Sequence, residues 1–345
     1  MTQRVLILAS HAVAEYDDTR MFHDLGYDVF TPGGYEDPRQ GTEGIRPPLP
    51  SVPFHADLAQ RCREQREAFG EPGYHIDWAK ARLHDDVIDW ADVIIVHHFP
   101  KVWIAEQWER IRHKRVVWRT CGQSDPATEA VMADLDGLQI VRYSPKERAA
   151  FERVGCFAGE TALIRFGKYP DDYGPYIGDW AVIGNVTQDM VARGDSTGLG
   201  FWRKFTDPFP AMPAGKGSEA LPGGIGALSY PDMLDYLRHI RTYFYTGTIP
   251  ASYTLGLIEA MLSGVPVVAI GLKTDSLDHQ WLHTISEAHD IVNPGLMLYD
   301  IPLAAYLENR EYAAMRGAEQ RAKAIELFGI ETVGAQWVDF LGSTA

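Results

Sequence analysis

The first candidate for chemistry is an acidic side chain, Glu259, within an apolar stretch that has helical periodicity. The residues just before it, Ser252, Tyr253, Thr254 and Leu255, would supply the free N–H groups at the start of that helix. Such amides bind phosphate, and a carboxylate one or two turns further along can accept hydrogen bonds from the two hydroxyls of a ribose. The spacing therefore predicts a binding site for a nucleoside diphosphate.

The elements that would position Glu259 follow from apolar runs and the breakers between them. Residues 243–245 form an aromatic, β-favouring run that Gly247 ends. Ser252 is a good N-cap for the helix, Gly264 ends it, and residues 265–270 form a short apolar strand. This order of strand, loop, helix and strand places the loop at the carboxyl edge of a parallel sheet, where α/β proteins bind ligands.

Two adjacent histidines form a second candidate site. The apolar residues 91–96 predict a buried strand that runs directly into His97 and His98. Side chains at the carboxyl end of a parallel strand are placed to meet a ligand, and His98 is preferred to His97 for this role. A purely structural role is the alternative for either histidine. Thr120 and Cys121 close the next strand and are expected at the same edge of the sheet.

The composition of this 345-residue chain argues against several classes of protein. Its 32 basic and 47 acidic residues give a net charge of −15, which disfavours extensive binding to nucleic acid or anionic membranes. Three widely spaced cysteines, no signal peptide and no apolar stretch of membrane-spanning length predict a cytoplasmic protein without disulfides or stable membrane insertion. One basic cluster keeps a local phosphate or nucleic-acid patch open, although solvated helix-end charge is the preferred explanation for it: Arg110, Arg112, Lys114, Arg115 and Arg119.

The remaining pattern predicts two α/β halves. Strands at 5–9 and 27–30 flank a helix, as in a βαβ unit, but the Gly-x-Gly-x-x-Gly motif is missing, which counts against a dehydrogenase. Ser144 and Glu147 form a capping box at the start of a helix. A Gly- and Pro-rich crossover around residues 161–176 places the domain boundary near Gly167, so domains of 1–166 and 167–345 are predicted.

Other segments of the first half are less regular. Residues 35–57 predict a long loop rich in Pro and Gly, either a lid over a substrate or a surface excursion. Helices are predicted around 58–69, 78–90 and 102–111.

The stretch around Glu259 resembles the C-terminal signature of the GT-B glycosyltransferases, in particular the large retaining group-1 family (glycosyltransferase family 4-like). That pattern has a first Glu, seven residues, a second Glu followed by Ala-Met, and then Gly-x-Pro-Val-Val. Its second half is matched by Glu259-Ala260-Met261 and by Gly264-Val265-Pro266-Val267-Val268. Ala251 stands where the family has the first Glu, which holds the donor sugar, so the chain resembles a divergent member.

The resemblance implies a GT-B fold, in which two Rossmann-like parallel-sheet domains of the α/β class face each other across a cleft. In such proteins the last helix, here about 330–345, often crosses back to the N-terminal domain. The resemblance also implies that Glu259 binds the ribose, that His98 or His97 reaches the donor sugar or its attacking partner, and that the loop containing Gly226 and Leu228 binds the base.

Arg193 resembles a basic residue with which the family neutralises the donor diphosphate. The family's following lysine is missing, since Leu199 occupies that region, and Lys204 or Lys216 is expected to supply the second charge. Adjacent acids such as Asp171-Asp172 lack the Asp-x-Asp spacing of a metal site. Arg193 and the helix N-terminus are therefore expected to replace a metal ion at the departing diphosphate.

The expected activity is transfer of a sugar from a nucleotide-sugar co-substrate, first of all a UDP-sugar, to an acceptor hydroxyl. The resemblance implies retention of configuration, and neither a metal nor another cofactor is expected. The acceptor stays open among a saccharide, a lipid, a small molecule and a modified DNA base. Three alternatives remain: a phage-type transferase acting on hydroxymethylpyrimidines in DNA, a non-catalytic nucleotide-sugar-binding protein, which Ala251 favours, and a nucleotide-sugar epimerase.

Overall fold

The computed structural model describes residues 2–9, 11–32, 46–68, 82–122, 124–270, 287–292 and 302–342. The chain forms two compact units, one of Met1–Gly167 with Val333–Ala345 and one of Lys168–Thr332. The chain thus leaves the first unit after Gly167 and returns to it at Val333. Among the described residues, no helix combines the length and the apolar character that a bilayer crossing requires.

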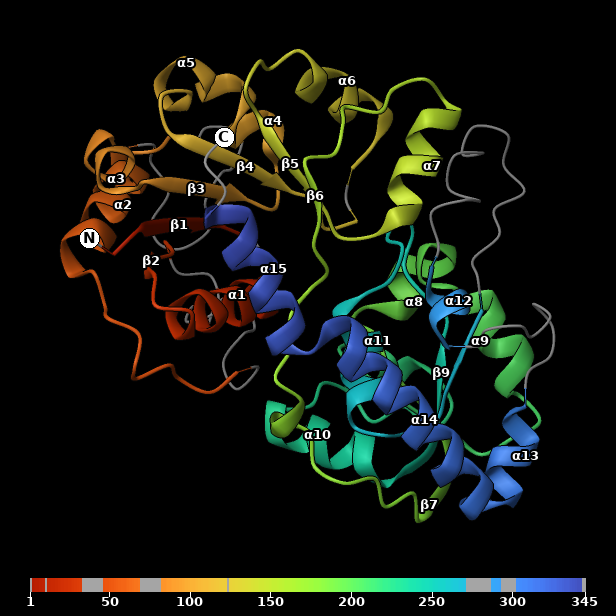
Figure 1. Ribbon diagram of the computed structural model, residues 1–345. Helices are drawn as coiled ribbons and strands as arrows, with labels where there is room; N and C mark the ends of the chain where they lie inside the picture. The colour runs from red at the N-terminus through yellow and green to blue at the C-terminus, as the bar shows by residue number, and fades with distance from the viewer. Residues whose placement is uncertain are drawn as a thin grey trace. The chain divides into compact units, whose positions relative to one another are not determined.

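The first unit contains a six-stranded sheet in which every pair of neighbouring strands is parallel (Figure 1). Its strand order is β2 (Asp28–Phe30), β1 (Arg4–Leu8), β3 (Val93–Val96), β4 (Arg115–Arg119), β5 (Gln139–Arg142) and β6 (Ala162–Leu163). All four residues of β3 are buried, as expected for a central parallel strand covered on both faces. The accompanying helices are α1 (Ala12–Asp24), α2 (Ala56–Ala68), α3 (Asp85–Trp90), α4 (Pro100–Trp103), η2 (Ala105–Gln107), α5 (Trp108–Ile111), α6 (Pro126–Ala133), α7 (Pro145–Arg153) and α15 (Ile330–Gly342).

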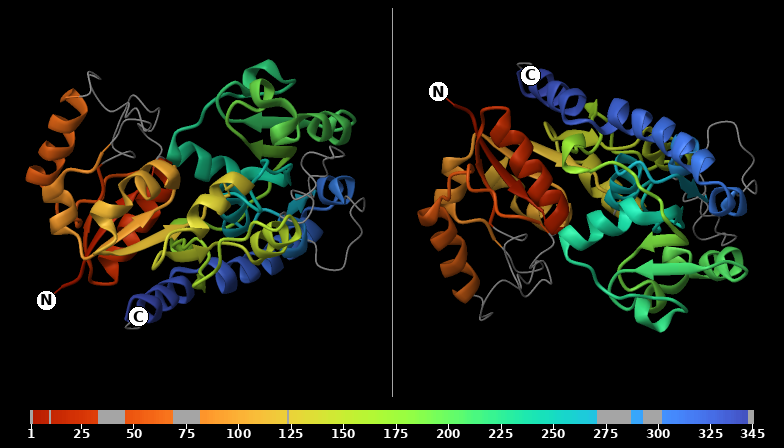
Figure 2. Two further views of the ribbon diagram at one scale, coloured as in Figure 1. Left: turned by 90° about the horizontal axis from the view of Figure 1, so that it is seen from above. Right: turned by 90° about the horizontal axis from the view of Figure 1, so that it is seen from below.

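The second unit contains a four-stranded parallel sheet with the order β10 (Val267–Ala269), β9 (Ile240–Tyr245), β7 (Trp180–Val186) and β8 (Ala211–Ala214). The helices α13 (Leu303–Glu308) and α14 (Arg310–Phe328), at the blue end of the colour range in Figure 2, pack on this sheet at β9. The helices of the unit are η3 (Pro170–Asp172), α8 (Met190–Arg193), η4 (Gly194–Thr197), α9 (Leu199–Thr206), η5 (Ser218–Ala220), α10 (Tyr230–His239), α11 (Leu255–Leu262), α12 (Ala288–Val292), α13 (Leu303–Glu308) and α14 (Arg310–Phe328).

Helix α14 fixes the position of α11 and β10, the elements around Glu259. A Cβ atom at Gly317 would lie 1.9 Å from the carbonyl oxygen of Gly264, so only glycine lets α14 approach the end of α11 this closely. The side chain of Gln320, also on α14, accepts a hydrogen bond from the Val267 amide (2.7 Å) and donates one to the Val267 carbonyl (2.8 Å). The backbone that carries Glu259 is therefore held by direct contact on its α14 side.

The prediction of one continuous helix over 102–111 is wrong, because the structure has α4, η2 and α5 there. The buried side chain of Gln107 accepts a hydrogen bond from the Leu83 amide (2.8 Å) and donates one to the Val102 carbonyl (3.2 Å). These bonds satisfy backbone groups that would otherwise need partners and stabilise the break between the turns. The helix predicted over 78–90 is described only from residue 82, with α3 at its end, and part of the predicted 35–57 loop lies outside the described residues.

Candidate functional site

The second unit carries the predicted diphosphate-binding loop between β9 and α11. The helix begins at Leu255 with Thr254 as its N-cap, so the prediction of Ser252 as the N-cap is wrong. Ser252 is buried, and its carbonyl accepts hydrogen bonds from the amides of Glu287 (3.1 Å) and Ala288 (3.4 Å). These bonds fix Ser252 in the loop two residues before the N-cap. The Leu257 amide on the first turn of α11 donates to the Thr254 carbonyl (3.1 Å). The amides of Leu255 and Gly256 precede the first complete turn, so the helix itself offers them no acceptor.

Glu259 lies on the second turn of α11, where its carboxylate forms a buried ion pair. Its Oε1 atom accepts a hydrogen bond of 2.7 Å from Nζ of Lys168, and the two side chains are only 7% and 2% exposed. A charge that is buried to this extent needs a partner of opposite charge, which explains why the two residues occur together. The role of Glu259 in ribose binding stays a prediction, to which the structure adds a cationic neighbour.

The turn after β7 carries Arg193, the predicted diphosphate ligand. Arg193 is the last residue of α8 and is exposed, and its Nη1 donates a long hydrogen bond of 3.4 Å to the Gln188 carbonyl. The same turn is bonded to the loop after β8, since the Asp189 amide donates to the Lys216 carbonyl (2.7 Å) and the Lys216 amide donates to the Gln188 side chain (2.8 Å). The structure thus joins Lys216 to the Arg193 turn, while Lys204 is exposed on α9.

The predicted base-binding loop follows β8. Gly226 has φ +82°, donates its amide hydrogen to Ser218 Oγ (2.9 Å) and accepts from the Gly215 amide (2.7 Å). This left-handed backbone conformation is one that side-chain-bearing residues rarely adopt, so the position favours glycine. Leu228 is half-buried just before α10. The predicted loops of this unit therefore follow the carboxyl ends of β7, β8 and β9, which are neighbours in one parallel sheet.

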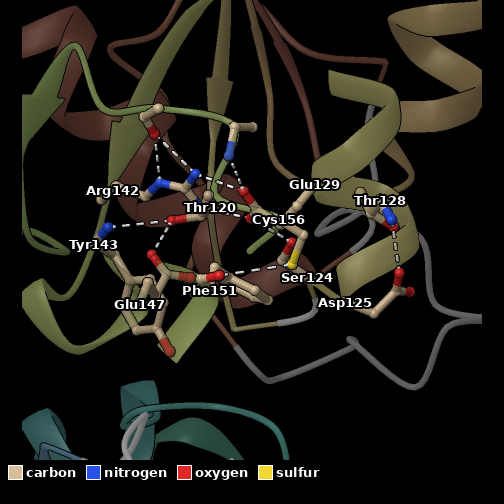
Figure 3. Close-up of polar contacts among 12 residues, drawn as sticks. Thr120, Ser124, Asp125, Thr128, Glu129, Arg142, Tyr143, Glu147, Phe151 and Cys156 are labelled. Carbon is tan, nitrogen blue, oxygen red and sulfur yellow. Dashed lines mark hydrogen bonds and ion pairs between the residues drawn. The ribbon is translucent and has the colours of Figure 1, made fainter. Parts of the chain in front are cut away.

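The first unit contains a pocket of about 330 Å³ at the carboxyl ends of β3 and β4. The structure brings the predicted residues His97, His98, Thr120 and Cys121 together in its wall. The other lining residues come from the start of α4, from β4 and from the segment that enters α6: Phe99, Pro100, Lys101, Val102, Trp118, Ser124, Asp125 and Thr128. Figure 3 shows Thr120, Ser124, Asp125 and Thr128 around part of this region.

The two histidines have different environments. The ring of His98 lies nearly parallel to those of His11 and His97, at centroid distances of 6.4 and 6.2 Å. Burial, together with these two rings, holds the pKa of His98 well below its usual value, so its imidazole is neutral at pH 7. His97 is also buried, and its Nε2 lies 2.8 Å from Oδ2 of Asp18. His97 is thus paired with Asp18, whereas His98 contributes a neutral imidazole to the pocket wall.

Asp18 is the centre of a buried charge cluster that holds His97 in place. Burial would raise the pKa of Asp18, but Arg119 and His97 outweigh it and hold that pKa at about 2. The guanidinium of Arg119 pairs with Asp18 and lies over the rings of Phe166 (4.8 Å) and Trp337 (5.3 Å). Asp18 is therefore ionised at neutral pH and anchors the Arg119 guanidinium, while burial lowers the pKa of His97, so its imidazole beside Asp18 is neutral at pH 7.

The cluster Arg110–Arg119 does not form a free basic patch. Arg119 is buried with Asp18, and Arg115 donates hydrogen bonds to the carbonyls of Phe340 (2.6 Å) and Leu341 (2.7 Å) on α15. Neither residue is a solvated helix-end charge, so that explanation is wrong for these two. The other three pair locally: Arg110 with Asp85, Arg112 with Glu109 and Lys114 with the Asp89 carbonyl. Within the described ranges, no three His, Cys, Asp or Glu side chains come together as a metal site.

Sequence reasoning missed a polar network behind the pocket wall (Figure 3). Ser144 caps α7 by accepting from the Lys146 amide (3.2 Å), but Glu147 does not complete the predicted capping box. The Glu147 carboxylate instead accepts a hydrogen bond from the Thr120 hydroxyl (2.5 Å) and is completely buried. Its Oε1 atom has no hydrogen-bond partner among the residues that the structure describes. The helix thus turns this acid inward, toward a residue of the pocket.

Loss of hydration on burial raises the pKa of Glu147 to about 7, against the opposing effects of Arg142 and Thr120. The folded chain therefore binds the proton of the Glu147 carboxyl group more tightly than the unfolded chain does, and this protonation stabilises the fold. The contribution to stability is complete below about pH 4.5 and is lost as the pH rises to about 7. We expect Glu147→Gln to remove this pH dependence, which is worth on the order of 3 kcal/mol. Thermal unfolding between pH 5 and pH 8 measures it, with the exposed Glu152→Gln on the same helix as control. Identical pH profiles for Glu147→Gln and the unmodified protein would contradict the expectation.

The sequence matches no protein-family model and no curated protein. The structure, however, is similar to that of HepE (Alr3699) from Anabaena in complex with UDP and glucose, over 100% of both chains, with 14% identity and a TM-score of 0.66. The complex of HepE with UDP-glucose aligns with 99% of this chain and 100% of that chain, with 14% identity and a TM-score of 0.65. A glycosyltransferase from Rickettsia africae aligns with 98% of this chain and 97% of that chain, with 10% identity and a TM-score of 0.60. The likeness confirms the predicted fold class: α/β, with two parallel-strand sheets, of the GT-B type.

Proposed function

We propose that this protein is a glycosyltransferase that moves a sugar from a UDP-sugar to an acceptor hydroxyl. The proposal is carried by one observation, the likeness over the whole chain to HepE, whose structures contain UDP, glucose and UDP-glucose. The positions of the predicted donor residues support it, because they follow three neighbouring strands of one parallel sheet. Retention of configuration and independence of metal ions belong to the same proposal.

The second unit would bind the donor. The first amides of α11 and the guanidinium of Arg193 would hold the diphosphate, and Glu259 would accept hydrogen bonds from the ribose hydroxyls. The loop around Gly226 and Leu228 would contact the base. As the bond between sugar and diphosphate breaks, negative charge grows on the departing phosphate, and fixed amides and a cation stabilise that charge without reorganisation.

The first unit would bind the acceptor in the pocket beside His98. A neutral imidazole can accept a hydrogen bond from an attacking hydroxyl or donate one to a sugar oxygen, depending on its tautomer. The pocket combines an aromatic wall at Trp118 with the hydroxyls of Thr120 and Ser124, which suits a hydroxyl-bearing group of modest size. Because the cations of the Arg110–Arg119 cluster are individually paired, they give no support to a DNA acceptor.

The test is incubation of the protein with UDP-glucose, UDP-N-acetylglucosamine, UDP-galactose and GDP-mannose in the presence of simple glycosides. We expect release of the nucleoside diphosphate from one of the UDP-sugars, unchanged by EDTA, and a rise in melting temperature on addition of UDP. NMR of the product's anomeric proton tests retention. Absence of both release and thermal shift would refute the assignment, whereas binding of a donor without turnover would support the non-catalytic alternative that Ala251 favours.

Arg193→Ala is expected to lower kcat about 100-fold, because removal of one preorganised group that stabilises transition-state charge commonly costs about 3 kcal/mol. The melting temperature should change little, since this side chain is exposed at the end of α8. Arg203→Ala, which removes an exposed arginine from the neighbouring helix α9, is the matched control and should keep full activity. Equal rates for the two variants would show that Arg193 does not contact the diphosphate.

A further inference from the structure

Lys168 is a buried lysine whose ammonium group contacts a residue of the proposed donor site. Its side chain is 2% exposed, and Nζ lies 2.7 Å from Oε1 of Glu259. The sequence separation of 91 residues shows that the contact is made by the fold and is not a local helix pair. Such a lysine can stabilise the fold of the second unit, and it can also orient the Glu259 side chain for ligand binding.

The backbone of Lys168 is fixed on both sides. Its amide donates to the Phe328 carbonyl (2.8 Å), its carbonyl accepts from the Ile330 amide (2.9 Å), and it pairs with Gly329 in an isolated parallel bridge. Lys168 is also the first residue of the second unit, and Phe328 and Ile330 lie just before the chain returns to the first unit at Val333. The ammonium therefore reaches Glu259 from an anchored point of the backbone.

A carboxylate on a helix has several side-chain rotamers, and binding a ribose requires one of them. An ammonium held at hydrogen-bond distance restricts the carboxylate before the ligand arrives, which lowers the ordering cost of binding. Stability alone is a weak reason for such a pair, because a well-packed apolar pair is often as stable as a buried ion pair or more so. The conjunction of burial, an anchored backbone and a carboxylate in the donor site favours a role in orientation.

We propose that Lys168 is a positioning residue that orients the Glu259 carboxylate toward the ribose hydroxyls of the donor nucleotide; the inference rests on the proposed function. Lys168 acts through Glu259 and is not itself a ligand of the sugar. The part of the nucleotide that the Lys168–Glu259 pair would recognise is the vicinal diol of the ribose. Loss of the lysine should therefore affect recognition of the diol more than recognition of the base or the diphosphate.

The experiment compares the affinities for UDP and for 2′-deoxy-UDP by isothermal titration calorimetry. We expect the unmodified protein to bind UDP about 10- to 100-fold more tightly than 2′-deoxy-UDP, because the deoxy ligand lacks one hydroxyl and therefore one hydrogen bond to the charged carboxylate. Lys168→Met should reduce this preference to about 3-fold or less, and Lys168→Arg should keep most of it. Lys323→Met, which removes an exposed lysine of α14, is the control and should leave both affinities unchanged.

The outcomes separate the inference from the proposed function. If the unmodified protein prefers UDP but Lys168→Met weakens both ligands equally, Lys168 is merely structural and the inference is overturned. If the unmodified protein binds no UDP, the proposed function fails and the inference fails with it. Should Lys168→Met not fold, the 15N signal of the Lys168 ammonium in the unmodified protein gives the answer, with Lys168→Arg identifying the signal. The chemical shift of this ammonium signal should change more on addition of UDP than on addition of 2′-deoxy-UDP. Equal changes with the two ligands would overturn the inference.

Discussion

Glu129→Ala is expected to lower the free energy of unfolding of the first unit by about 3–5 kcal/mol. Glu129 and Arg142 form a bidentate ion pair with two contacts of 2.7 Å, and neither side chain is exposed to solvent. The carboxylate also accepts hydrogen bonds from the Ser124 hydroxyl (2.7 Å) and the Ala158 amide (3.0 Å). Removing it would leave a buried guanidinium without its counter-charge, which costs far more than the lost contacts alone.

Two further variants separate charge from packing. Glu129→Gln keeps the shape and the hydrogen-bond acceptor, so its loss should be smaller than that of Glu129→Ala. The double variant Glu129→Leu/Arg142→Met removes both charges and should recover most of the stability, because an apolar pair of similar volume can replace a buried ion pair. Urea unfolding at pH 7 measures all three variants. A loss below about 1 kcal/mol for Glu129→Ala would show that water or rearranged side chains satisfy Arg142.

The same network bears on the pocket of the first unit, since Ser124 and Thr120 line that pocket and donate their hydroxyl hydrogens to Glu129 and Glu147. Arg142 adds aromatic contacts, with its guanidinium over the rings of Phe157 (4.7 Å) and Trp118 (5.3 Å). The pocket wall is therefore backed by paired charges instead of by apolar packing alone. Its hydroxyl groups are fixed before a ligand binds, as a selective polar site requires.

Local patterns in the sequence predicted much of the fold. The apolar periodicity of 255–262 and the apolar run of 91–96 correspond to α11 and β3, because both patterns depend on neighbouring residues in the chain. The starts and breaks of helices were harder to predict. Thr254 replaces Ser252 as N-cap, and the Ser252 carbonyl instead accepts from the distant amides of Glu287 and Ala288. Gln107 stabilises a break within the predicted helix through its contact with Leu83, 24 residues away.

The buried ion pairs could not be assigned from the sequence, because each joins segments that the fold brings together. Asp18 meets Arg119 across 101 residues, and Lys168 meets Glu259 across 91. One signal was available: Arg142 directly follows the apolar residues Ile140 and Val141, and a cation within a buried strand needs a buried acid. The sequence could show that such a partner exists, but not that it is Glu129.

Glu259→Ala should have two separate effects, and the pair with Lys168 allows them to be distinguished. The first is a loss of UDP affinity of about 100-fold or more, because the carboxylate is the proposed acceptor for two ribose hydroxyls. The second is a loss of about 3–5 kcal/mol in the free energy of unfolding, because the buried ammonium of Lys168 loses its counter-charge. A reduced affinity alone would therefore not identify Glu259 as a ligand.

The double variant Glu259→Leu/Lys168→Met resolves the two effects. It has no unpaired charge, so the stability of the second unit should return close to that of the unmodified protein, whereas the UDP affinity should stay about 100-fold low. Calorimetric titration with UDP and urea unfolding of the same preparations provide both values. If the double variant recovered UDP binding together with stability, Glu259 would be a structural acid, and the donor site would depend on Arg193 and the α11 amides alone. If stability returned without UDP binding, the carboxylate itself would be the group that the nucleotide requires, because the fold around it would be intact.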